Sequence, residues 1–195
     1  MIQTRLSILM VYLMQQWKTN VLVTQMTNPN GEPAHAIEAF SFEGASLPVV
    51  FESTGKVAEG VVCDVYRFDG DDTKDLGIVT IDPGAYTPLQ RVHEGEATVE
   101  GIIEGNGRLM ISRVNGDLEV HTREKVVIFH PGASITIQTR TNTTAPFQVT
   151  VHIGDLMQWQ NTSGERMIVS EVCTPPYQDG RFENLPGILT MPEYD

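Results

Sequence analysis

Short runs of alternating or β-branched residues, separated by turn residues, occupy most of the chain after residue 30. The runs that predict strands are 60–68, 77–81, 97–103, 108–114, 117–122, 126–129, 134–139, 147–151 and 167–172. The Asn115-Gly116 pair between two alternating runs is the strongest short hairpin signal. About ten short strands without a long helical pattern among them are typical of an antiparallel sandwich or barrel.

Two segments depart from this pattern. Residues 6–14 form an apolar run that is too short to span a bilayer, which needs about 20 residues. The run predicts a short helix packed on the domain, or a start codon assigned too far upstream. A secretion signal is the remaining alternative, although no small-residue cleavage site follows the run. A second possible helix covers 34–40. We therefore expect an N-terminal extension over 1–25, a single domain over 26–195 with its barrel at about 45–175, and a cytoplasmic protein without a membrane segment.

The net charge and the cysteine content of the chain exclude several classes of function. The 195 residues contain 25 acidic and 13 basic side chains, a formal net charge of −12. Since no Lys/Arg cluster offsets this charge, nucleic-acid binding is not expected. Cys63 and Cys173 form no CxxC motif, which excludes a disulfide framework and a zinc knuckle. The chain also has no phosphate-binding Gly-rich loop with Lys and no Gly-x-Ser-x-Gly elbow.

Two stretches resemble the conserved motifs of the cupin superfamily. In 83–109, Gly84 precedes the motif's histidine positions, and Glu104-Gly105 ends its apolar strand. In 152–161, Gly154 and Asn161 occupy their positions in the second motif. The resemblance to small bacterial cupins implies an all-β, cupin-like antiparallel β-barrel or jelly roll with N- and C-terminal extensions. It also implies a homodimer.

The resemblance implies a degenerate metal site. Metal-binding cupins use three His and one Glu, and the corresponding positions here are Arg91, His93, Thr98 and Met157. A guanidinium has no lone pair to donate, Thr is a poor ligand, and a thioether suits copper rather than iron, manganese or zinc. The sequence thus predicts no divalent metal and no other cofactor.

The same alignment with the cupin motifs predicts a small-molecule pocket in the barrel. Arg91 and His93 alternate onto one face of a strand, and we expect that face to line the barrel. The candidate ligand-binding residues are Arg91, His93, Glu96, Thr98, Glu100, Met157, Trp159 and Tyr177. We expect a metal-free cupin-like protein that binds a small anionic or sugar-like ligand. The first alternative is a sugar isomerase or epimerase with His93 as catalytic base, and the second is a scaffold in which Arg91 only pairs with Glu96 or Glu100.

Two further expectations concern residues outside the pocket. The segment 178–182 predicts an ordered loop anchored by Tyr177 and Phe182, either over the barrel mouth or against a second subunit. His121 alternates with Glu119 on a strand that we expect to be exposed, which predicts a solvated imidazole.

Overall fold

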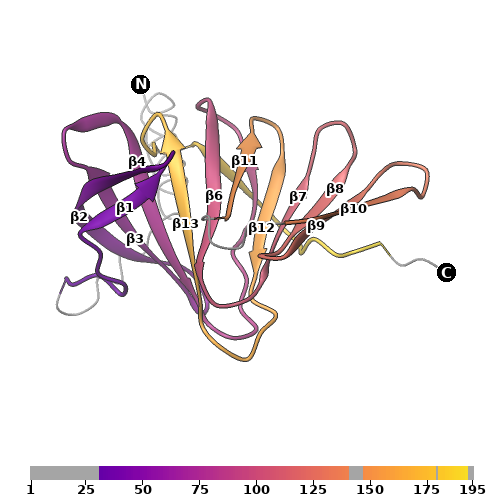
Figure 1. The fold of residues 1–195 in the computed structure, drawn as a ribbon, viewed down its shortest axis with the longest axis horizontal. Coiled ribbons are helices and arrows are strands. Elements are labelled where there is room, and N and C mark those ends of the chain that lie inside the picture. The colour runs from indigo at the N-terminus through magenta and orange to yellow at the C-terminus, as the bar shows by residue number, and fades with distance from the viewer. Residues whose placement is uncertain (1–30, 141–146, 179, 193–195) are drawn as a thin grey trace, which may run out of the picture.

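Two antiparallel seven-stranded sheets face each other in the computed structural model, which describes residues 31–140, 147–178 and 180–192 (Figure 1). The first sheet has the order β1-β2-β3-β4-β13-β6-β11, and the second has the order β10-β9-β8-β7-β12-β5-β14. The strands are β1 (Ala39–Phe42), β2 (Ala45–Ala58), β3 (Val61–Phe68), β4 (Asp71–Ile81), β5 (Leu89–Val92), β6 (Ala97–Glu104), β7 (Arg108–Ser112), β8 (Leu118–His121), β9 (Lys125–Phe129), β10 (Ile135–Thr139), β11 (Phe147–His152), β12 (Leu156–Gln160), β13 (Met167–Thr174) and β14 (Phe182–Leu185). This arrangement confirms the predicted all-β barrel or jelly roll.

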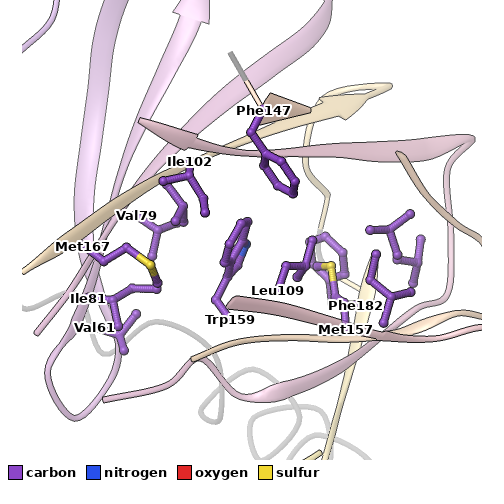
Figure 2. Close-up of a cluster of buried hydrophobic side chains, with 14 of the residues drawn as sticks. Val61, Val79, Ile81, Ile102, Leu109, Phe147, Met157, Trp159, Met167 and Phe182 are labelled. Carbon is purple, nitrogen blue, oxygen red and sulfur yellow. The ribbon is translucent and has the colours of Figure 1, made fainter. Parts of the chain in front are cut away.

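The main core lies between the two sheets. Inward positions of the first sheet supply Val79, Ile102 and Met167, and those of the second sheet supply Leu109 and Trp159, so their side chains meet across the barrel (Figure 2). The alternation of the strands places these side chains on the inner face and leaves the intervening positions on the outer face. Burial of this apolar surface holds the sheets together.

A second core covers the outer face of the first sheet. It is formed by Phe42, Val49, Tyr66, Phe68, Leu76, Ile78, Ile168 and Val172. The segment before β1 is tied to this face, because the Tyr66 hydroxyl donates to the His35 carbonyl at 2.8 Å and the His35 amide donates to Asp64 Oδ2 at 2.8 Å.

The structure differs from the sequence prediction in several elements. The described part of 34–40 contains no helix, and Ala39–Phe42 is a strand instead. Residues 1–20 lie outside the described residues. The predicted strand at 77–81 is the end of the longer β4, and β1 and β2 were not predicted. The segment predicted as a loop at 178–182 leads into β14, which pairs with β5 as an edge strand. The proposed division of the chain into 1–25 and 26–195 stays a prediction.

Candidate functional site

The barrel encloses a cavity of about 830 Å³ on the side where β2 and β3 of the first sheet approach β5 and β14 of the second. This volume is within the range of small-molecule pockets, about 300–1,000 Å³. The lining combines carboxylates, thiols, amides and an indole. The rim is formed by residues 52–58 of β2 and by Glu59, and the other lining residues are Cys63, Val65, Asp75, Gly77, Val79, Thr87, Gln90, Glu100, Met157, Trp159, Glu171, Cys173, Tyr177, Phe182 and Asn184.

Two glutamates face each other in the cavity wall. Glu100 on β6 and Glu171 on β13 are directly opposed in the antiparallel ladder, a register that brings Cβ atoms to about 5 Å. The next strand places Gly77 opposite Glu171. A Cβ at Gly77 would lie 3.3 Å from Cys63 Sγ and 3.7 Å from Glu171 Oε2. The missing side chain therefore leaves the space into which the Glu171 carboxyl extends.

One carboxyl oxygen of Glu100 accepts a hydrogen bond from Trp159, and the other accepts none among the described residues. Trp159 Nε1 donates to Glu100 Oε2 at 2.7 Å across the barrel. Among the described residues Glu100 Oε1 has no hydrogen-bond partner, although the side chain is only 1% exposed. Burial raises the pKa of Glu100 to about 7, because desolvation of the carboxylate outweighs the bond from Trp159 and the smaller effects of the Thr98 hydroxyl and the Arg181 charge.

Glu171 and Asp75 add two more carboxyls, on residues that are half-buried. Burial and the nearby charges of Glu100 and Asp75 raise the pKa of Glu171 well above its usual value. The Cys173 thiol lies 3.7 Å from Glu171 Oε1 as a weak donor. Burial also raises the pKa of Asp75, which accepts a hydrogen bond of 2.7 Å from the Tyr177 amide. Burial therefore lets the glutamate pair hold a proton at a higher pH than exposed carboxyls do.

Arg181 is a buried cation whose charge acts on these carboxyls. Its charge lowers the pKa of Glu100 and of Glu171, but by less than burial raises them. Both Nη atoms donate to main-chain carbonyls, Nη1 to Pro175 at 2.9 Å and Nη2 to Ala97 at 2.6 Å. The guanidinium thus fixes the chain around the cavity and does not line it.

The structure places three of the predicted site residues outside the cavity. Arg91 is exposed to solvent by 42% and pairs with Glu183 at 2.9 Å, not with Glu96 or Glu100. His93 and Glu96 are exposed. The predicted inward face of this strand is therefore wrong by one residue, because Gln90 lines the cavity and Val92 packs into the core.

Four other predicted residues do line the cavity, namely Glu100, Met157, Trp159 and Tyr177. Thr98 is buried on the same strand as Glu100, two positions away, but is not part of the lining. Sequence reasoning missed Asp75, Gln90 and Glu171. Glu171 carries a readable signal, since it is the single charged residue within the apolar run 167–173.

The structure does not fit the metal site that cupins commonly contain. Of the four motif positions, Arg91 and His93 point away from the cavity, and Thr98 and Met157 are poor ligands for iron, manganese or zinc. Within residues 31–140, 147–178 and 180–192, no group of three His, Cys, Asp or Glu side chains is placed to hold a metal ion. The predicted absence of a metal stays a prediction.

A second polar cluster, outside the cavity lining, joins Glu119 and His121 of β8 to Arg113 after β7 and Arg140 after β10. Glu119 Oε2 accepts hydrogen bonds from Arg113 Nη2 and His121 Nε2, both at 2.7 Å, and Arg140 Nη2 donates to His121 Nδ1 at 3.1 Å. Because Arg140 can only donate, His121 is the neutral tautomer with its proton on Nε2. The expectation of a solvated His121 is wrong, since its side chain is only 8% exposed.

Burial and hydrogen bonding act in opposite directions on the pKa values in this cluster. Burial lowers the pKa of His121, even though Glu119 acts in the opposite direction. Burial alone would raise the pKa of Glu119, but the bonds from His121 and Arg113 outweigh it and lower the pKa to about 2. The cluster therefore consists of an ionised carboxylate, a neutral imidazole and two guanidiniums at neutral pH.

Comparison with known proteins supports the fold only. No family model and no curated protein match the chain. Similar solved structures include a cupin-2 domain protein from Rhodospirillum rubrum, at 14% identity and a TM-score of 0.44, covering 80% of this chain and 83% of that protein. The capsular polysaccharide assembling protein CapF from Staphylococcus aureus aligns at 13% identity and a TM-score of 0.46, with 71% and 32% covered.

Oxalate decarboxylase from Bacillus subtilis aligns at 18% identity and a TM-score of 0.42, with 63% of this chain and 28% of that one covered. This chain thus spans about a third of the length of CapF and of the decarboxylase. The chain is similar to cupins in fold, as the sequence motifs predicted. Identities of 12–18% and TM-scores below 0.5 carry nothing about a site or a reaction. None of the described residues lies in a helix that could cross a membrane.

Proposed function

We propose that this cupin-like protein binds a small, hydroxyl-rich, sugar-like molecule in the barrel cavity. The observation that carries the proposal is the lining: the buried carboxyl of Glu100, the indole of Trp159 and the amides of Gln90 and Asn184 surround one space of about 830 Å³. Carboxyls and amides both donate or accept as protonation and orientation allow, which suits hydroxyl groups. An indole offers a flat apolar surface for a sugar ring.

The cavity favours a sugar-like ligand over an anionic one. Three carboxyls line it, those of the buried Glu100 and of the half-buried Asp75 and Glu171, whereas the guanidiniums of Arg91 and Arg181 do not. An anion would have to approach these acids without a compensating cation. The isomerase alternative has no support from geometry, because the exposed His93 does not line the cavity.

Fluorescence of Trp159 gives a direct test. Trp17 is the second tryptophan of the chain, so a Trp17→Phe background leaves Trp159 as the only indole. We expect a panel of neutral sugars and polyols to contain a compound that changes Trp159 emission and raises the melting temperature. A ligand at 100 times its Kd stabilises by about 2.7 kcal/mol.

A pair of glycine variants separates cavity binding from surface binding. Gly77→Val puts a branched side chain into the cavity beside Cys63, whereas Gly164→Val faces open space. The ligand-induced shift should disappear in the first variant and persist in the second. If no sugar or polyol alters emission or melting in the wild-type cavity, the proposal fails and the scaffold alternative is favoured.

The homodimer, the cytoplasmic location and the absence of a divalent metal remain predictions. Sedimentation of the purified protein tests the dimer. Elemental analysis tests the metal, and one equivalent of iron, manganese or zinc per chain would contradict the donor set described above.

A further inference from the structure

The lining of the cavity carries more acidic than basic side chains, which favours a ligand with a positively charged group. The described lining contains five acids, Glu52, Glu59, Asp75, Glu100 and Glu171, against one base, Lys56. Lys56 Nζ is already paired with Glu59 Oε2 at the rim, 2.5 Å away. A cavity with this balance attracts positive charge and repels negative charge.

A buried acceptor in the wall lacks a donor. Glu100 Oε1 has no hydrogen-bond partner among the described residues, while Oε2 is bonded to Trp159. An unpaired buried acceptor costs about 1–3 kcal/mol, which a donor on the ligand would recover. Because Glu171 is directly opposite on β13, one donor group placed between the two carboxyls can reach both.

The protein's own cations do not fill this position. Both Nη atoms of Arg181 donate to main-chain carbonyls, and its side chain does not line the cavity. Trp159 also lines this space, with 3% of the residue exposed, and an indole is the best natural partner of a cation. A ligand can supply the donor and the charge that the wall lacks.

We propose that the ligand carries a protonated amino group, as an amino sugar does, and that the Glu100–Glu171 carboxyl pair binds this ammonium. The inference rests on the proposed function and adds the class of ligand. When the ammonium enters, its charge favours the carboxylate form, and the proton held by the pair leaves to solvent as the cation takes its place. No covalent bond forms or breaks. Binding is therefore coupled to proton release.

Four glucose-derived compounds test the inference by calorimetry at pH 6.5: the pyranoses D-glucosamine, N-acetyl-D-glucosamine and D-glucose, and the open-chain acid D-gluconate. We expect glucosamine to bind at least about ten-fold more tightly than the two neutral sugars, the effect of one charged hydrogen bond. Gluconate should bind most weakly. Released protons are taken up by the buffer, so the heat for glucosamine should be more exothermic in MES than in phosphate.

Substitutions test whether the Glu100–Glu171 pair causes the preference for glucosamine. Glu100→Gln and Glu171→Gln keep the shape and should each reduce the preference for glucosamine about ten-fold or more. Glu104→Gln, at the exposed end of the same strand β6, is the matched control and should leave the preference unchanged. If either glutamine variant fails to fold, the selectivity and the proton release of the wild type still decide the question.

The outcomes separate the two proposals. If glucose or N-acetylglucosamine binds as tightly as glucosamine, without proton release, the ammonium inference is overturned and the proposed function stands. Tightest binding by gluconate would overturn the inference as well. If none of the four compounds binds and the wider panel of sugars and polyols gives no response, the proposed function fails together with the inference.

Discussion

Trp159 and Glu100 connect the two sheets of the barrel through a hydrogen bond of 2.7 Å from the indole nitrogen to the carboxylate. Trp159 lies on β12 of the second sheet and Glu100 on β6 of the first. The bond satisfies the indole donor and one oxygen of a fully buried acid. It is also the point at which the apolar core of Figure 2 meets the polar cavity.

Removal of the indole donor should cost stability mainly when Glu100 is ionised. We expect Trp159→Phe to lower the free energy of unfolding by about 1–3 kcal/mol at pH 8, beyond the loss of packing, because a charged oxygen then lacks its donor. At pH 5.5, where Glu100 is protonated, this extra loss should shrink. Urea denaturation at the two pH values measures it. In a Glu100→Gln background the extra pH-dependent loss should be absent, and its persistence there would contradict the assignment.

The glutamate pair should make the protein less stable as pH rises. The pKa of Glu100 is raised from 4.5 to about 7, so the folded state holds a proton that the unfolded chain releases. The resulting stability is present below pH 4.5 and lost between pH 4.5 and 7, on the order of 3 kcal/mol. Glu100→Gln should flatten this part of the stability curve, and an unchanged slope would contradict the burial of an ionisable Glu100.

His121 and Glu119 should act in the opposite direction at acid pH. Burial keeps His121 neutral in the folded state while the unfolded imidazole gains a proton below its usual pKa of 6.5. Stability from this group is therefore present above pH 6.5 and lost as pH falls. We expect His121→Gln to reduce the acid-side slope. Nitrogen-15 chemical shifts of the imidazole should show the Nε2–H tautomer at pH 7, and an imidazolium there would contradict the Arg140 contact.

Gly95 should be among the glycines least tolerant of substitution. Its φ is +93°, and a Cβ there would lie 2.3 Å from Arg181 Nη1. Gly84→Ala is a matched control, because Gly84 has φ +74° with no atom within 4 Å of its Cβ position. Both variants pay the backbone cost of about 1 kcal/mol, and Gly95→Ala should lose at least about 2 kcal/mol more through displacement of a buried cation. Equal melting temperatures would show that Arg181 can move freely.

The sequence by itself determined the strands whose apolar alternation is regular. The runs around β3, β6, β8, β9, β10, β11 and β13 and the Asn115-Gly116 hairpin appear in the structure close to their predicted places. These elements follow from local patterning and turn chemistry, which do not depend on distant residues. The predicted inward faces of Glu100, Met157 and Trp159 also follow from alternation within their strands.

Only the tertiary structure decided which side of the short β5 faces the cavity. A strand of four residues carries little periodic signal, and a shift of one residue exchanges Arg91 and His93 for Gln90 and Val92. Pairing with β12 and β14 fixes that choice. Similarly, Glu100, Glu171 and Asp75 come together through the order β4-β13-β6, in which strands distant in sequence are neighbours. The carboxyl cluster exists because the fold places these acids side by side in the cavity wall, a relationship that local sequence patterns do not encode.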